Sequence, residues 1–434
     1  MKFSKKEIID FVGTEDLNGQ SIRLPYGIKT RGDSRSEAIE LVLGELKKSQ
    51  TVLDIGSSLG LFCLTCLQHG ARAVTGFELN RDSLSRAKRI ADFLQLKPRY
   101  LRLNVEECPD IEKHDIVLCL NLLRYLRNPV GVLRYLASRT NDTLIIETAH
   151  VGDRDVKSIA KFWGKASTLP RLPGFLMRLL VASMFKTTSN ALVAPYSPKT
   201  SLRAFSFSKT ALDAVLSTHM KLFYSVQIKP SRQKDRYFVV CKKLKIKHLV
   251  LVSGACGSGK STFIEKALPS GCSSTLGLND ESFAVVSGSV IRSRKLSKFF
   301  PGQVNDSVVF HYDILPIHKC GIDSYDRDPS LDVLMCAEKV SVVMLAPEKD
   351  QLLSQMIASE TTNGSMSKYH SDLRKKYQSP GWLSETYLDW LDFLGRRLAD
   401  VDSCDVYDYH GLTNQLNRVS NIQELRGVIE NRYS

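Results

Sequence analysis

The stretch Leu249-Val-Leu-Val-Ser-Gly-Ala-Cys-Gly-Ser-Gly-Lys-Ser-Thr262 limits the possible fold of this chain more than any other. It fits the pattern G-x-x-x-x-G-K-[ST] without a mismatch, and it begins with an apolar run that is typical of a strand. Such a strand turns through glycines into a helix N-terminus, where free backbone N–H groups and the helix dipole bind phosphate oxygens. The stretch therefore predicts a site for a nucleoside triphosphate.

The residues of this loop have separate expected roles. Lys260 is expected to reach the β- and γ-phosphates, and the Ser261 hydroxyl is expected to hold Mg²⁺. The rest of the loop is expected to surround the phosphates, through Gly254, Gly257, Ser258, Gly259 and Thr262. ATP with Mg²⁺ is the predicted ligand of this half of the chain.

Length and composition place the chain in a broad class. A chain of 434 residues is too long for one ordinary core, which predicts at least two domains. With 43% hydrophobic and 24% charged residues, it is typical of soluble globular proteins. No apolar run approaches the roughly 20 residues of a membrane span. The N-terminus lacks a signal-peptide core and the ten cysteines follow no spacing framework. We therefore expect a cytoplasmic protein with reduced thiols.

The positive charge is concentrated in one stretch. Residues 151–250 carry 19 Lys and Arg against 4 Asp and Glu, whereas residues 1–150 carry 22 against 19 and residues 251–434 carry 19 against 23. An excess of this size suits an anionic partner: a nucleic acid, a phosphorylated glycan or an anionic membrane surface. A solvated basic face without a partner is the alternative.

The first half begins with a second strand–turn–helix pattern. Ser34 or Ser36 can cap a helix whose apolar positions share one face. Residues 51–64 then read as an apolar strand with Asp54 near its end, a Gly-rich turn and a helix. A second strand ends in Glu78, 24 residues beyond Asp54. This pattern predicts a Rossmann-like βαβ unit with an acid placed for ribose hydroxyls.

These residues resemble the class I S-adenosylmethionine-dependent methyltransferases. The first motif of that family is matched by Asp54, Gly56 and Gly60, while Ser58 replaces its middle glycine. The resemblance implies S-adenosylmethionine as cofactor, with Glu78 on the ribose, Asn104 and Val105 beside the adenine, and Asn121 at the turn after the fourth strand. The alternative is a dinucleotide-binding oxidoreductase, but residues 56–60 break the G-x-G-x-x-G pattern of that class.

The resemblance extends to residue 246 and surrounds an insertion. A helix from Ser208 and strands from Leu222 and Arg236 look like the closing helix and hairpin of the methyltransferase sheet. We therefore predict a methyltransferase domain over 1–246 with an insertion at 151–205, and a second domain over 247–434. Within the insertion, residues 170–186 read as a buried helix, a lipid-contacting helix or a lid; all three remain open.

The sequence offers few groups for methyl-transfer chemistry. Arg124 and Tyr125 follow the fourth strand, where related enzymes often carry a histidine. Glu147 and His150, after the fifth strand, are the predicted alternatives for a base. An already ionised acceptor needs no base, and Arg124 would suit one. The pair Cys63 and Cys66 is interpreted as two buried thiols on one helix face rather than a zinc site.

The second half resembles the small P-loop kinases. Residues 307–313 read as an apolar strand that ends in Asp313, which is expected to hold Mg²⁺ or accept a proton, while His311 and Tyr312 are expected to pack. A strand near 340–345 leads through Pro-Glu into a helix, a helix follows over 382–398, and residues 405–409 are predicted as the last strand. The lid-cation candidates, for which a solvated basic helix is the alternative, are Arg374, Lys375 and Lys376.

Together these patterns predict an α/β protein with a Rossmann-like methyltransferase domain followed by a P-loop NTPase, nucleotide-kinase-like domain. The main hypothesis is a bifunctional methyltransferase and kinase acting on an anionic small molecule, phosphorylated glycan or lipid-linked saccharide, with peripheral contact to the inner face of a membrane left open. The alternative is an RNA-directed methyltransferase with a regulatory ATPase or scaffold domain. The oligomeric state is not predicted.

Overall fold

The computed structural model describes residues 3–149, 193–196, 204–233, 236–278, 283–315, 324–363, 368–399 and 401–433. The chain divides into two compact units. The first unit comprises Met1–Leu216 and Val226–Lys243, and the second comprises Ser217–Ser225 and Leu244–Ser434. His150 and nearly all of the predicted insertion 151–205 lie outside the described residues. Within that insertion the structure describes only β6 (Val193–Tyr196) and the first residues of β7 (Ala204–Phe207), which pair antiparallel.

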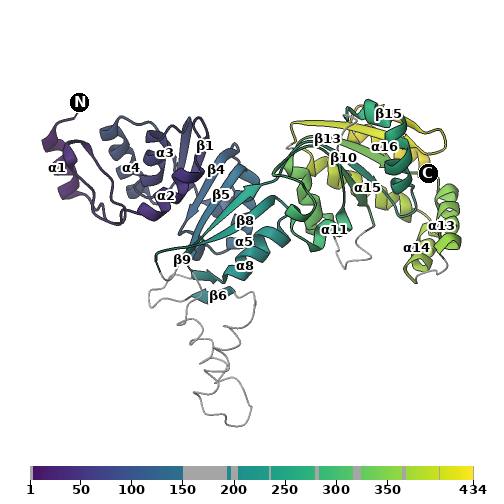
Figure 1. The fold of residues 1–434 in the computed structure, drawn as a ribbon, viewed down its shortest axis with the longest axis horizontal. Helices are drawn as coiled ribbons and strands as arrows, with labels where there is room; N and C mark the ends of the chain where they lie inside the picture. Colours follow the sequence, from purple (N-terminus) through teal and green to yellow (C-terminus); the bar gives the residue numbers. More distant parts are fainter. Residues whose placement is uncertain are drawn as a thin grey trace, which may run out of the picture. The chain divides into compact units, whose positions relative to one another are not determined.

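The first unit is built on a seven-stranded sheet in the order β3-β2-β1-β4-β5-β9-β8 (Figure 1). The five strands expected from the sequence run parallel, and β9 pairs antiparallel with β5. The strands are β1 (Thr51–Ile55), β2 (Ala73–Phe77), β3 (Arg99–Leu101), β4 (His114–Leu120), β5 (Thr140–Ala149), β8 (Phe223–Pro230) and β9 (Arg236–Lys243). This is the Rossmann-like methyltransferase fold, in which a cofactor binds at the carboxyl ends of the strands.

Helices follow the first strands of this sheet in alternation. Helix α3 contacts β1 and β2, α4 contacts β3, and α5 contacts β4 and β5. The helices of the unit are α1 (Lys5–Thr14), α2 (Ser36–Glu45), α3 (Leu61–Gln68), α4 (Arg81–Leu94), α5 (Pro129–Arg139) and α8 (Lys209–Ala214). The predicted serine cap of α2 is wrong, because Arg35 occupies the N-cap position in a left-handed conformation without a side-chain cap.

The second unit is built on a six-stranded sheet in the order β11-β12-β10-β13-β14-β15 (Figure 1). Five strands are parallel and β15 pairs antiparallel with β14. The strands are β10 (Lys245–Gly254), β11 (Ala284–Ser287), β12 (Val304–Asp313), β13 (Ala337–Leu345), β14 (Ser403–His410) and β15 (Gln415–Val419). The prediction that residues 405–409 form the last strand is wrong, because β15 follows. Its side chains are mostly polar and none is buried, so the sequence carries no apolar pattern there.

The helical segments of the second unit begin directly after the predicted phosphate loop. They are α9 (Lys260–Thr262), a π-helical stretch (Phe263–Cys272), α10 (Ser273–Leu276), α11 (Gly288–Ser293), a 3₁₀ segment (Pro329–Cys336), α13 (Lys349–Asn363), α14 (Lys368–Gln378), α15 (Trp382–Arg397) and α16 (Ile422–Tyr433). The helix predicted over 382–398 is confirmed by α15, and the one predicted after the Pro-Glu turn is confirmed by α13.

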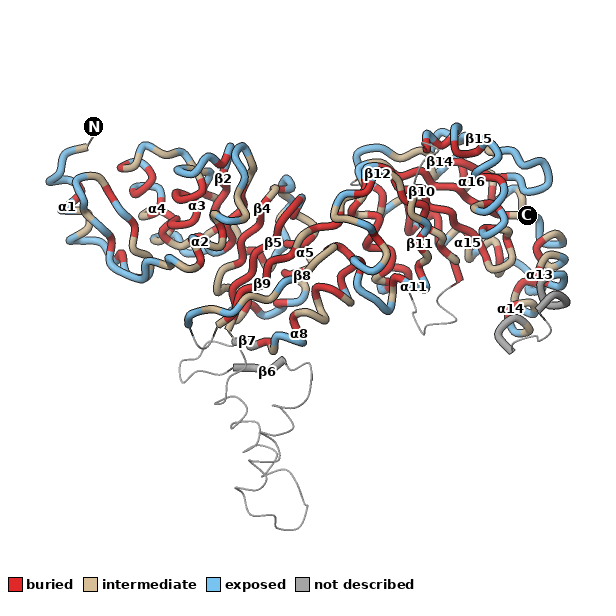
Figure 2. The backbone as a smooth tube through the Cα atoms, viewed as in Figure 1, coloured by how far each residue is buried: buried red, intermediate tan, exposed pale blue. Residues whose placement is uncertain are grey.

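Burial is concentrated in the central strands of each unit (Figure 2). Residues 116–119 of β4 and 249–252 of β10 are fully buried, as expected of strands covered on both faces. Cys63 and Cys66 are also buried, as interpreted from the sequence. Among the helices of the described ranges, none combines the length and apolar composition that a membrane crossing requires.

Candidate functional site

The turn after β1 is fixed to the end of β2 by backbone hydrogen bonds. The N–H groups of Gly56 and Ser57 both donate to the carbonyl oxygen of Phe77, at 2.9 and 2.8 Å. Gly60 is the N-cap of α3 with φ 86°, and a Cβ there would stand 1.9 Å from the hydroxyl oxygen of Tyr100. Only glycine fits this position, so the turn and the helix start are held in one geometry.

Glu78 connects the same turn to the start of the next helix. Its carboxylate accepts one hydrogen bond from the Ser58 N–H at 2.9 Å and another from the Asn80 N–H at 2.8 Å. Ser58, which replaces the middle glycine of the family pattern, takes the left-handed conformation with φ 52°. A carboxylate has about four acceptor sites. Glu78 therefore keeps acceptor capacity for hydroxyl groups of a ligand.

A cavity of about 420 Å³, called here the first cavity, opens beside these residues. It brings together most of the cofactor residues expected from the sequence: Gly56, Ser58, Glu78, Asn104, Val105 and Asn121. Tyr125 also lines it, whereas Asp54 and Gly60 are not part of the lining. Gly19, Gln20 and Arg35 line it as well. No motif predicted these three, because Gly19 and Gln20 lie in irregular backbone and Arg35 is a helix N-cap without a capping side chain.

Gln20 and Asn121 are both fixed in the lining of the first cavity by hydrogen bonds. Gln20 accepts a hydrogen bond from the Leu61 N–H at 3.1 Å, which satisfies one of the free donors at the start of α3. Asn121 has φ 61°, and its N–H donates to the carbonyl oxygen of Glu147 at 2.8 Å. The Oδ1 atom of Asn121 is buried and has no partner among the described residues. A ligand donor at that point would satisfy it.

Asp54 is a buried acid under the turn. Burial raises the pKa of its carboxyl group to about 7, the nearby Glu78 adds to the rise, and a hydrogen bond from the Cys63 thiol and the charge of Arg35 oppose it. The Sγ of Cys63 lies 3.5 Å from the Oδ2 of Asp54. Asp54 therefore supports the turn from below, and its charge depends on pH near neutrality.

Glu147, predicted as a base, is buried at the end of β5 between two guanidinium groups. Arg35 and Arg236 both form ion pairs with its carboxylate, the latter at 3.0 Å. A carboxylate held by two cations is suited to positioning Arg35, which also lines the first cavity. The base role of Glu147 stays a prediction that these contacts do not favour. His150, the other predicted base, lies outside the described residues.

In the second unit, two glycines at the end of β10 and in the turn that follows it are packed closely, and a third has a left-handed backbone. A Cβ on Gly254 would lie 2.4 Å from the carbonyl oxygen of Leu345, and one on Gly257 would lie 2.7 Å from the Cγ of Met356 on α13. Gly259 has φ 89° and caps α9. The buried ammonium group of Lys260 donates to the carbonyl oxygens of Gly254 at 2.9 Å and Ala255 at 2.6 Å.

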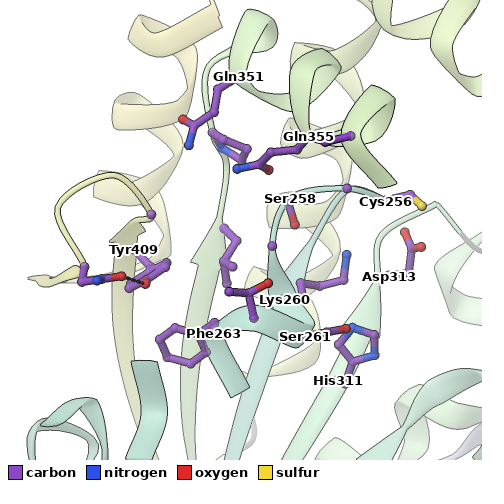
Figure 3. A pocket seen from close by; sticks show the side chains of 18 residues that line it. Cys256, Ser258, Lys260, Ser261, Phe263, His311, Asp313, Gln351, Gln355 and Tyr409 are labelled. Atoms are coloured by element: carbon purple, nitrogen blue, oxygen red, sulfur yellow. Dashed lines mark hydrogen bonds between the residues drawn. The ribbon is translucent and has the colours of Figure 1, made fainter. Parts of the chain in front are cut away.

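Asp313 lies beside this loop because β12 pairs in register with β10. The register sets Gly254 opposite Asp313, and the Ile314 N–H donates to the carbonyl oxygen of Gly254 at 3.2 Å. Ser261 and Asp313 both line a cavity of about 540 Å³, called here the second cavity (Figure 3). No cluster of three metal-ligating side chains occurs in the described ranges. One hydroxyl and one carboxylate fit Mg²⁺, which takes its other ligands from water and phosphate.

The second cavity has two distinct ends (Figure 3). Asp313 and His311 lie at one end, where burial and the charge of Lys260 lower the pKa of His311 to about 4. Phe263 and Tyr409 lie at the other end with Asn414, which is bonded to Tyr409, and Gln351 and Gln355 of α13 also line the cavity. Sequence patterns did not predict these side chains, since no motif joins α13 to the turn after β14.

The predicted lid cations are not part of this lining. Arg374, Lys375 and Lys376 lie on α14, and none of them lines the second cavity. The Nζ of Lys376 stands 5.5 Å from the ring centre of Trp382, a cation–π contact. Helix α14 meets the loop through another residue, Tyr377, whose hydroxyl donates to the carbonyl oxygen of Cys256 at 2.9 Å.

Residues 52–141 match the family model described as "Methyltransferase domain". The first unit contains a methyltransferase domain. The matched range covers β1 to the start of β5 and hence most of the lining of the first cavity. The methyltransferase domain also resembles two curated proteins, each named tRNA U34 carboxymethyltransferase. The one from Shewanella amazonensis is 30% identical over 132 residues, and the one from Shewanella loihica is 29% identical over 168 residues.

These matches cover part of each protein. They span 29% and 37% of this chain and 40% and 49% of the two relatives. Among solved structures, the N-terminal domain of EvdMO1 with SAH bound has a TM-score of 0.39 at 15% identity, covering 56% of this chain and 97% of that one. Magnesium protoporphyrin IX methyltransferase from Synechocystis PCC 6803, with bound SAH, has a TM-score of 0.34 at 15% identity, covering 48% and 83%.

Proposed function

We propose that the methyltransferase domain binds S-adenosylmethionine in the first cavity and methylates an RNA, and that the second unit binds a magnesium nucleoside triphosphate as a regulatory domain. The observation that carries the first part is the convergence of Gly56, Ser58, Glu78, Asn104 and Asn121 on one cavity, within a range that matches a methyltransferase family model. S-adenosylmethionine supplies an electrophilic methyl group when bound.

Different residues of the first cavity would contact different parts of this cofactor. Glu78 would accept hydrogen bonds from the ribose hydroxyls through its remaining acceptor sites. Val105 and the backbone beside Asn104 would flank the adenine. The unsatisfied Oδ1 of Asn121 would accept from a cofactor donor, and Arg35, fixed by Glu147, would offer its guanidinium to an anionic group. Catalysis would then rest mainly on alignment of the methyl group with its acceptor.

RNA is the proposed acceptor for two reasons. The two Shewanella relatives are named for tRNA U34, and residues 151–250 carry the excess of positive charge that a polyanion requires. The phosphorylated glycan or lipid-linked saccharide of the main sequence hypothesis receives no support from the comparisons. The alternative hypothesis, an RNA-directed enzyme with a regulatory nucleotide-binding domain, is therefore the proposal.

The proposal for the second unit rests on the geometry of its loop. Gly254, Gly257 and Gly259 have the close packing or left-handed backbone that a phosphate loop needs, and Lys260 and Ser261 open into the same cavity as Asp313. Free N–H groups at the start of the following helix would bind phosphate oxygens. Labelled ATP separates the possible activities: hydrolysis or stable binding without a phosphorylated product supports the regulatory domain, and transfer of the label to an acceptor supports a kinase.

The acceptor is tested by methyl transfer from tritiated S-adenosylmethionine to bulk tRNA, ribosomal RNA and lipid-linked saccharides. We expect the label in an RNA fraction. We also expect RNA binding to weaken about tenfold or more between 50 and 200 mM salt, because binding releases counterions. The Glu78→Ala variant should lose the transfer, while Glu112→Ala, at an exposed ion pair with Arg99, should keep it. Label in saccharide alone would refute the RNA proposal.

A further inference from the structure

The end of the second cavity remote from Asp313 is built from aromatic rings and side-chain amides. The rings of Phe263 and Tyr409 meet edge to face, with centres 4.6 Å apart and an angle of 68° between their planes. The Tyr409 hydroxyl donates to the Oδ1 of Asn414 at 2.7 Å, which fixes the amide of Asn414 beside the Tyr409 ring. A flat apolar surface with polar groups at its edge is suited to a planar heterocycle.

Helix α13 brings two further amides to the cavity (Figure 3). Gln351 and Gln355 are one helical turn apart and both line the cavity. The Nε2 of Gln351 lies 3.9 Å from the point where a Cβ on Gly411 would stand, so Gln351 closes the cavity against the turn after β14. The Oε1 of Gln355 is buried without a hydrogen-bond partner among the described residues. A buried acceptor in this state indicates a missing donor.

We propose that this end of the second cavity binds the base of the nucleotide and that Gln351 selects adenine. The inference rests on the proposed triphosphate site, because the loop at Lys260 fixes where the phosphates lie. A side-chain amide carries a donor and an acceptor on one edge. It matches the N6–H donor and N7 acceptor of adenine. Guanine and hypoxanthine present two acceptors, O6 and N7, on that edge, so one of them would face the amide oxygen.

Gln355 and Asn414 offer further hydrogen-bonding groups that are consistent with this assignment. The buried Oε1 of Gln355 needs a donor, which an exocyclic amino group or a ribose hydroxyl supplies and a phosphate does not. The amide of Asn414 can donate to a ring nitrogen because its Oδ1 already accepts from Tyr409. Phe263 and Tyr409 offer the apolar surface beneath the ring. The site therefore favours an adenine nucleotide over other purine nucleotides.

Calorimetric titration of the full chain with Mg-ATP, Mg-ITP, Mg-GTP and Mg-tripolyphosphate tests the inference. ATP and ITP differ only at the six-position of the purine and its adjacent ring nitrogen. The variant is Gln351→Ala, and the matched control is Gln423→Ala, an exposed amide on α16 that does not line the cavity. Tripolyphosphate reports on the loop alone.

We expect the wild type and Gln423→Ala to bind ATP about 5- to 100-fold more tightly than ITP or GTP. In Gln351→Ala this preference should fall to about threefold or less, with tripolyphosphate affinity unchanged. Equal affinities of the wild type for the three nucleotides, or a preference that survives Gln351→Ala, would overturn the adenine assignment and leave the triphosphate site intact. If neither tripolyphosphate nor any nucleotide bound, the proposed function of the second unit would fail together with this inference.

Discussion

Asp54 is a buried carboxyl group whose ionisation the fold disfavours. Its pKa is raised to about 7 in the folded chain from an ordinary value of 3.8, chiefly by burial. Between these values the folded state binds more protons than the unfolded state, so stability falls as pH rises from about 4 to about 7 and stays low above that. The cost of ionising Asp54 is on the order of 4 kcal/mol at pH 8, because its pKa rises from 3.8 to about 7.

The Asp54→Asn substitution removes this cost and therefore has a pH-dependent effect. We expect the melting temperature of the variant, relative to the wild type, to be higher at pH 8 than at pH 5 by about 3–8 °C. Thermal unfolding followed by calorimetry without cofactor at both pH values is the measurement. A difference between the two proteins that does not change with pH would contradict the buried, neutral carboxyl group.

Asp328 in the second unit has the opposite character, because donors surround its charge. Arg292 donates to both carboxylate oxygens through Nε, Tyr312 donates its hydroxyl at 2.9 Å, and Ser330 donates its N–H and hydroxyl. The carboxylate is fully buried. Removing one partner of a buried ion pair leaves the other charge unpaired, which usually costs about 3–5 kcal/mol.

We therefore expect Asp328→Ala to lower the free energy of unfolding by about 3–5 kcal/mol, measured by urea denaturation of the transition that contains the second unit. The control is Asp326→Ala, two residues earlier. Its carboxylate is exposed and lies 4.0 Å from Arg396, so the loss should be below about 1 kcal/mol. Equal losses for the two variants would show that the buried network contributes little.

Among the elements, the turn between β1 and α3 is the most sensitive to side-chain volume. Gly60 combines φ 86° with a virtual Cβ that overlaps the Tyr100 hydroxyl oxygen at 1.9 Å. Gly44, inside α2, has no atom within 4 Å of its virtual Cβ and an ordinary helical backbone. The same substitution at the two glycines should therefore have opposite effects.

We expect Gly60→Ala to destabilise the chain by about 2 kcal/mol or more, from backbone strain and overlap together. Gly44→Ala should stabilise it by up to about 1 kcal/mol, the gain in helix propensity. Melting temperatures of the two variants against the wild type are the measurement. A melting temperature of Gly60→Ala equal to that of the wild type would contradict the left-handed turn at Gly60.

Elements with a strong local pattern were predictable from the sequence. The apolar runs of β1, β10 and β12, and the glycines that follow the first two, indicated strand–turn–helix units directly. Strand β15 carries no such pattern, because it pairs at an exposed edge. The amides Gln351 and Gln355 meet Tyr409 and Asn414 only through tertiary packing. Arg35 has a left-handed backbone and forms an ion pair with Glu147, and both features place its side chain at the first cavity. Neither feature can be recognised in the local sequence.

At the scale of the whole molecule, the chain enters its second unit before the methyltransferase sheet is complete. Residues Ser217–Ser225, which include the first residues of β8, belong to the second unit, although the rest of β8 and β9 return to the first unit. Within that unit, the buried Lys221 donates to the carbonyl oxygens of Ser217 at 3.4 Å and Arg294 at 2.7 Å. Burial lowers the pKa of Lys221 to about 8. No sequence motif predicted that residues 217–225 belong to the second unit, because their assignment depends on the tertiary contacts that bury them.

We propose that one chain holds two independent sites, one for S-adenosylmethionine and one for a nucleoside triphosphate. Calorimetric titration of the full chain with S-adenosylmethionine and with Mg-ATP tests it, using Glu78→Ala and Lys260→Ala as a reciprocal pair. We predict one site for each ligand, with Glu78→Ala weakening only S-adenosylmethionine and Lys260→Ala weakening only Mg-ATP, each by about 10- to 100-fold. The absence of binding heat for either ligand in the wild type, or a single variant that abolishes both, would contradict it.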